Sequence, residues 1–89
     1  MKIELTNGKT YQVLWCGVSS IDEKIRINLQ GSTISDAFST FTNPEETRSI
    51  KYYRSDSGTG WYDEYEGYTN LKGINEDNRG IVVTLAKGD

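Results

Sequence analysis

The sequence contains no histidine, which removes the commonest general base and the commonest zinc ligand. Its one cysteine, Cys16, can form neither an internal disulfide nor a thiolate cluster, and its apolar neighbours predict a buried, inert thiol. The nucleophile motifs Gly-x-Ser-x-Gly and Ser-x-x-Lys are absent, and the glycine-containing stretch 56–60 lacks the Gly-Lys-Ser/Thr of a phosphate loop. We therefore expect no catalytic residues, no cofactor and no metal site.

Long hydrophobic runs are also lacking. The longest apolar stretches, at 13–16 and 81–83, fall far short of the roughly 20 residues that a membrane-spanning helix needs. Lys2 follows Met1, but the apolar segment of a signal peptide does not come after it. We expect a protein that has no membrane partner, begins near Met1 and remains in the cytoplasm of the cell that makes it.

The charge balance argues against binding to nucleic acid. The formal net charge is −3, and a binder of phosphate backbones is normally basic. The acids Asp56, Asp63, Glu64 and Glu66 lie between Ser55 and Gly67 without an intervening base. Strand alternation would place Asp63 opposite to Glu64 and Glu66, and their spacing matches no calcium loop. A solvated strand face that discourages edge pairing is favoured over a carboxylate pair or a calcium site.

Alternating apolar and polar residues predict most of the secondary structure. Strands are expected at about residues 2–6, 10–18, 24–30, 47–54, 61–66, 68–74 and 81–85. Asn7-Gly8 predicts a hairpin with a type I′ turn, because that turn needs positive φ at both central positions. The segment around Leu14–Cys16 is apolar on both faces, which predicts a central strand. Gly67 is expected to mark a bulge or bend, after which 68–74 continues the sheet.

The hydrophobic period changes after Gly31. Ile34, Ala37, Phe38 and Phe41 form one stripe of a short amphipathic helix, which Asn43-Pro44 should end. Ser32 or Thr33 can cap its start, and Phe38 and Phe41 are expected to dock on the sheet. The sequence thus predicts a single α+β domain over residues 1–89. It should be a mostly antiparallel sheet of about six or seven strands with one short helix at about 33–42 packed on it.

The aromatic residues are unevenly placed, since six of the ten lie between residues 52 and 68. One sheet with one short helix cannot cover both faces, so some of these rings should be exposed. The candidate partner-binding residues are Tyr52, Tyr53, Trp61, Tyr62, Asp63, Tyr65 and Tyr68. Three explanations are open: ordinary strand residues with wet polar tips, a protein-binding surface, or a platform for stacking sugars. Stacking of single-stranded nucleic acid is disfavoured by the acidic neighbours.

Several segments together resemble small proteins encoded by bacteriophages and prophages of Gram-positive bacteria, often among tail and baseplate genes. The chain opens Met1-Lys2-Ile3-Glu4-Leu5-Thr6-Asn7-Gly8, similar to the Met-Lys-x-x-Leu-x-Asp/Asn-Gly start of those proteins. The helix 34–41, the tripeptide Gly67-Tyr68-Thr69 and the closing Val83-Thr84-Leu85-Ala86 follow in the same order. The segment 61–65 has no counterpart in that pattern.

The resemblance implies a role in the virion or in a prophage and brings no catalytic residues with it. The first hypothesis is a non-enzymatic structural or assembly protein of the tail or baseplate, acting through protein–protein contacts that include contacts between its own copies. The second is a phage-encoded adaptor or inhibitor that binds a host protein through the acidic and aromatic segment 52–68. A carbohydrate-binding module is the third.

Overall fold

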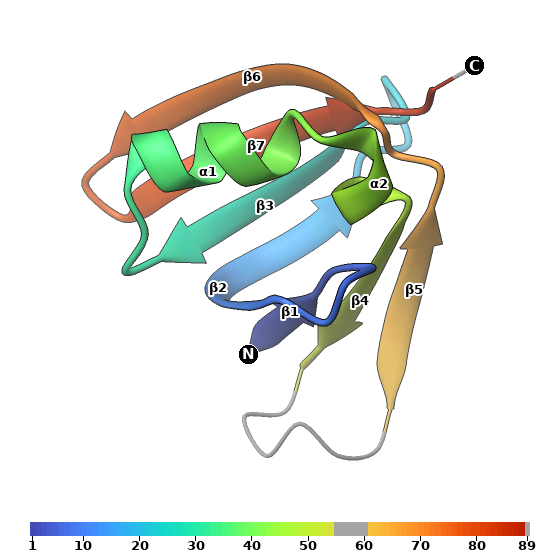
Figure 1. Ribbon diagram of the computed structural model, residues 1–89, viewed down its shortest axis with the longest axis horizontal. Coiled ribbons are helices and arrows are strands. Elements are labelled where there is room, and N and C mark those ends of the chain that lie inside the picture. Colours follow the sequence, from blue (N-terminus) through green and yellow to red (C-terminus); the bar gives the residue numbers. More distant parts are fainter. Residues whose placement is uncertain (55–60, 89) are drawn as a thin grey trace.

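A computed structural model describes residues 1–54 and 61–88 and shows one seven-stranded sheet in which every pairing is antiparallel (Figure 1). The strands are β1 (Lys2–Glu4), β2 (Thr10–Val18), β3 (Ile25–Gln30), β4 (Ser49–Tyr53), β5 (Tyr62–Glu66), β6 (Asn70–Asp77) and β7 (Gly80–Ala86). Their spatial order is β5-β4-β1-β2-β3-β7-β6, which leaves β5 and β6 at the two ends. The expected α+β, mostly antiparallel class is confirmed, and so is the central position of β2.

The connection after β5 differs from the prediction. Gly67 has a φ of +84°, a conformation that favours glycine, and its N–H still bonds to the carbonyl of Arg48 beside β4. After the short segment 67–69 the chain enters β6, which pairs with β7 and is the last strand in the order of the sheet (Figure 1). Residues 68–74 therefore do not continue the sheet beside β5, because Tyr68 belongs to the crossing segment and is buried in it.

The first turn is not the type I′ turn that Asn7-Gly8 predicted. Positive φ occurs at Gly8 (+89°) but not at Asn7, and the Leu5 N–H donates to the carbonyl of Lys9 at 2.8 Å. This is a three-residue loop in which glycine supplies a bulge. The Asn7 side chain explains why this loop forms instead of a type I′ turn. It accepts a hydrogen bond from the Lys9 N–H and donates one to Glu46 at 2.8 Å.

Helix α1 (Ile34–Phe41) lies over β6 and β7 on one face of the sheet (Figure 1). Of the two predicted capping residues, Ser32 and Thr33, it is Thr33 that forms the N-cap, accepting a hydrogen bond from the N–H of Asp36 at 3.1 Å. Phe41 is fully buried, but Phe38 is 59% exposed, so the expected docking of Phe38 on the sheet is wrong. The buried side is centred near Ala37, and the helical repeat turns Phe38 away from it.

A second, four-residue helix, α2 (Pro44–Thr47), was not predicted. Asn43 caps it by accepting a hydrogen bond from the N–H of Glu45, and proline occupies its first turn, where no N–H is needed. Asn43-Pro44 therefore ends one helix and begins another. The extra turn moves the start of β4 from the expected residue 47 to Ser49.

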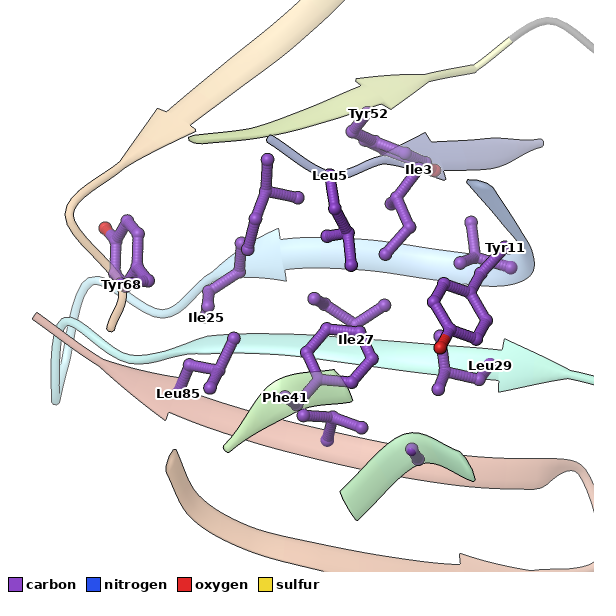
Figure 2. Close-up of a cluster of buried hydrophobic side chains, with 14 of the residues drawn as sticks. Ile3, Leu5, Tyr11, Ile25, Ile27, Leu29, Phe41, Tyr52, Tyr68 and Leu85 are labelled. Carbon is purple, nitrogen blue, oxygen red and sulfur yellow. The ribbon is translucent and has the colours of Figure 1, made fainter. Parts of the chain in front are cut away.

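The core lies on the face of the sheet that α1 and α2 cover (Figure 2). Its buried apolar residues are Ile3, Leu5, Tyr11, Val13, Ile25, Ile27, Leu29, Ala37, Phe41, Ile50, Tyr52, Tyr68, Ile81, Val83 and Leu85. Apart from Leu5 and Tyr68, which lie in connecting segments, they come from β1, β2, β3, β4, β7 and α1, so the two halves of the sheet share one core. On the opposite face Trp15 remains 39% exposed.

Candidate protein-binding surface

Strand alternation divides the predicted aromatic residues between the two faces of the sheet. Tyr52 is 6% exposed and Tyr68 is 7% exposed, so both rings belong to the core and neither is available to a partner. Tyr65 also faces inward, is half-buried, and meets the Tyr68 ring edge-on at 6.4 Å between centroids. The candidate surface is therefore reduced to Tyr53, Trp61 and Tyr62, with Asp63 on the inner side of β5.

Tyr53 and Tyr62 form a row with Lys2 across the outer face of three strands. In the register of the sheet Lys2 lies opposite Tyr53, and Tyr53 lies opposite Tyr62. The two ring centroids are 5.2 Å apart with their planes inclined at 43°. The ammonium groups of Lys2 and Lys51 lie 5.2 and 5.3 Å from the Tyr53 and Tyr62 centroids, within the range of a cation–π contact.

A charged row runs beside this aromatic one. Glu4 lies opposite Lys51, and Lys51 lies opposite Glu64, so acid and base alternate from β1 to β5. Glu64 also accepts a hydrogen bond from the Ser49 hydroxyl at 2.8 Å. The ammonium groups of Lys2 and Lys51 thus lie over the Tyr53 and Tyr62 rings on the outer face of the sheet.

Edge strand β5 presents backbone groups to solvent. The bond from the Gly67 N–H to the Arg48 carbonyl is 2.9 Å long and continues the ladder between β4 and β5. Because residues in an antiparallel ladder bond alternately to either side, Tyr65 and Asp63 bond to β4. The residues whose N–H and C=O groups point away from β4 are Tyr62, Glu64 and Glu66. Trp61, immediately before the strand, is 94% exposed.

The acids of β5 do not converge. Asp63 forms an ion pair with Arg54 at 2.9 Å on the inner side, whereas Glu64 and Glu66 are exposed on the outer side, as alternation predicted. Asp56 lies outside the described residues. Within residues 1–54 and 61–88, no group of three acidic or cysteine side chains is placed to hold a metal ion.

A polar cluster that no local sequence pattern predicts joins β2 to α1. The Tyr11 hydroxyl lies 2.8 Å from Asp36 Oδ2 and 2.8 Å from Thr40 Oγ1, and Lys9 Nζ donates to both Asp36 and Thr40. The hydrogen bond from Tyr11, helped by Lys9, lowers the pKa of Asp36. Each of these side chains is partnered within the cluster, so its arrangement is that of a structural link between strand and helix.

Cys16 faces the core side of β2, opposite Ile27. Burial, with a smaller contribution from the negative charge of Asp63, raises the pKa of its thiol to about 12. A thiol with that pKa is protonated at neutral pH and is a poor nucleophile. Burial of the Cys16 side chain is therefore the physical reason to expect an inert thiol.

No protein-family model, curated protein or solved structure matches the chain. Among the described residues, neither helix has the length and apolar character needed to cross a membrane. The function is therefore inferred from the geometry of the sheet and from the sequence pattern.

Proposed function

We propose that this chain is a non-enzymatic protein-binding domain whose edge strand β5 pairs with an extended segment of a partner protein. The observation that carries the proposal is the position of Trp61, which is 94% exposed directly beside a strand edge with outward-pointing backbone groups. Tryptophan and tyrosine are the residues that most often anchor protein interfaces. Trp61 and Tyr62 supply such anchors, and the β5 backbone supplies a row of hydrogen bonds.

The charges on β5 define the kind of segment that fits. Glu64 and Glu66 are exposed on the outer face, and each also directs its backbone outward. A strand added at this edge would place its own side chains directly across from these carboxylates, where opposite charges stabilise a pair. The preferred partner is therefore an extended segment with lysine or arginine at alternate positions and an apolar residue near Trp61.

The resemblance to proteins encoded among tail and baseplate genes sets the biological context of the proposal. In that context the partner is another virion protein, and the chain acts in assembly of the tail or baseplate. The alternative is a host protein that the chain binds as an adaptor or inhibitor. Mass spectrometry of purified phage particles separates the two, because an assembled structural protein is present at a fixed number per particle and a host-directed inhibitor is not.

Binding to β5 can be tested with peptides selected from a random library by the intact chain. Peptides with alternating basic residues should be enriched, and the double variant Trp61→Ala/Tyr62→Ala should bind them at least about 10-fold more weakly, as expected for loss of interface anchors. Ile21→Ala is the matched control, since Ile21 is as exposed as Trp61 and lies in the loop between β2 and β3, outside both edge strands. Equal affinity of the double variant and the native chain would contradict the proposal.

A further inference from the structure

We propose that the opposite edge of the sheet, strand β6, binds a second copy of this chain in a two-fold symmetric dimer. β6 is the last strand in the order of the sheet, beyond β7. In the proposed dimer two β6 strands pair antiparallel, and the two sheets become one continuous sheet. This interface uses a different edge strand from the partner site on β5.

The backbone of β6 is correctly oriented for this pairing. Asp77 lies opposite Gly80 across a two-residue turn, and such a closing pair bonds within the hairpin. By alternation Asn75 also bonds to β7, so Ile74 and Glu76 direct their N–H and C=O groups outward. The other side of the sheet gives the same orientation for β6. The hydrogen bond from the Ser19 N–H to the Lys24 carbonyl shows which β3 residues bond to β2, so the residues between them bond to β7. The β7 residues that do not bond to β3 then bond to β6.

One register satisfies both the backbone and the charges. If Ile74 lies opposite Ile74 of the second copy, the outward-pointing groups of both residues bond to each other. The same register places Lys72 opposite Glu76 of the second copy, and symmetry repeats this pair. Lys72 is the extra residue at the register shift between Leu71 and Gly73 and is exposed, as is Glu76. Two complementary charge pairs therefore flank the two-fold axis.

An apolar flank of α1 adjoins the same edge. Asp36 and Thr40 face β2, where they bond to Tyr11, so the opposite flank of the helix faces the β6 side. Ile34 and Phe38 lie one turn apart on that flank and are 44% and 59% exposed. Pairing of β6 with its copy would bring two such flanks toward each other and cover apolar surface that the single chain leaves in water.

Self-pairing at β5 is disfavoured by its charges. A two-fold axis through Glu64, the middle of the three β5 residues whose backbone groups point outward, places Glu64 opposite Glu64 of the second copy. Like charges directly opposite each other destabilise a strand pair. The two edges thus differ in the partner they accept: an acidic edge for a basic segment, and a mixed-charge edge for a second copy.

Charge reversal tests both the dimer and its register by sedimentation equilibrium over a range of concentrations. Lys72→Glu and Glu76→Lys should each raise the dimer dissociation constant about 10-fold, because each replaces two attractive pairs by two repulsive ones. The double variant Lys72→Glu/Glu76→Lys should restore it to within about 3-fold of the native value, since the pairs are reversed but complementary. Glu45→Lys on α2 is the matched charge control and should leave dimerisation unchanged.

Three outcomes would overturn the proposal. The first is a monomer at all concentrations up to about 1 mM, the weak limit of specific association. The second is a dimer that neither single reversal weakens, and the third is one that the double variant fails to restore. Circular dichroism of each variant shows whether the fold is retained. Dimerisation should persist in Trp61→Ala/Tyr62→Ala, so failure at β6 is distinguishable from failure of the proposed partner site at β5.

Discussion

The hydroxyl of Tyr11 on β2 lies 2.8 Å from a carboxylate oxygen of Asp36 on α1. The same hydroxyl contacts Thr40 one turn further along the helix, and Lys9 completes the cluster. Tyr11 also packs against Phe41, with 5.6 Å between the ring centroids. One tyrosine therefore fixes the position of the helix through both its polar tip and its ring.

Removal of the Tyr11 hydroxyl should destabilise the fold through this link alone. Tyr11→Phe keeps the ring packing, so we expect a loss of about 1.5–3 kcal/mol in the free energy of unfolding, as for a hydrogen bond to a charged group. Asp36→Asn should cost a similar amount, and the double variant should cost less than the sum of the two. Urea unfolding of the three variants measures the coupling, and strict additivity would show that the two side chains do not interact.

The stability of the fold should fall in acid because two carboxylates have lowered pKa values. The hydrogen bond from Tyr11 lowers the pKa of Asp36, and Arg26 followed by the Lys24 N–H lowers that of Asp22. Unfolded aspartate has a pKa of about 3.9, so the stabilisation is fully present above that pH and is lost as the pH falls below it toward the folded values. Thermal melts from neutral pH to pH 2 should show a shallower decline for Asp22→Asn/Asp36→Asn than for the native chain.

The two phenylalanines of α1 should respond very differently to truncation. Phe41 is fully buried, so Phe41→Ala should cost about 3–5 kcal/mol through lost burial and the cavity it leaves. Phe38→Ala should change the stability of the monomer by less than about 1 kcal/mol, because more than half of the side chain already meets water. Chemical unfolding at low protein concentration measures the free energy of unfolding of both variants. Equal losses of stability would mean that the helix buries a different side.

Cys16 should react slowly with thiol reagents in the folded protein. Its pKa of about 12 leaves almost no thiolate at pH 8, and the group becomes an ordinary thiol with a pKa near 8.5 only when the chain unfolds. We expect alkylation by iodoacetamide at pH 8 to be at least about 100-fold slower in buffer than in denaturant. Comparable rates in the two conditions would show that the thiol is accessible and ionised in the folded state.

Much of the fold could be predicted from local patterns. Residues 10–18 were predicted as a strand with the bounds of β2, and the helix was located to within a residue or two, because alternation and the Thr33 cap are local signals. The turn at Asn7 could not be predicted, since Glu46, far away in sequence, holds the asparagine side chain. The crossing at Gly67 also depends on a distant element, because the β6–β7 hairpin joins the sheet through the pairing of β7 with β3, which lies much earlier in the sequence.

The positions of the candidate residues in the sheet could be predicted only in part, for the same reason. Alternation predicts that Asp63 faces away from Glu64 and Glu66, as the structure has them. It could not show that Tyr52 lies against the core or that Tyr68 is buried in a crossing segment, because both depend on which strands are neighbours. The link between Tyr11 and Asp36 spans 25 positions of the sequence and has no local signal either.

The most direct test of the β5 site is the backbone amide spectrum of the isotope-labelled chain titrated with a selected basic peptide. Strand addition at β5 predicts large shifts of the Tyr62, Glu64 and Glu66 amides, because their N–H groups form new hydrogen bonds. The Asp63 and Tyr65 amides, already bonded to β4, should move much less. Equal shifts along the strand, or shifts confined to another part of the sheet, would contradict partner binding through this edge.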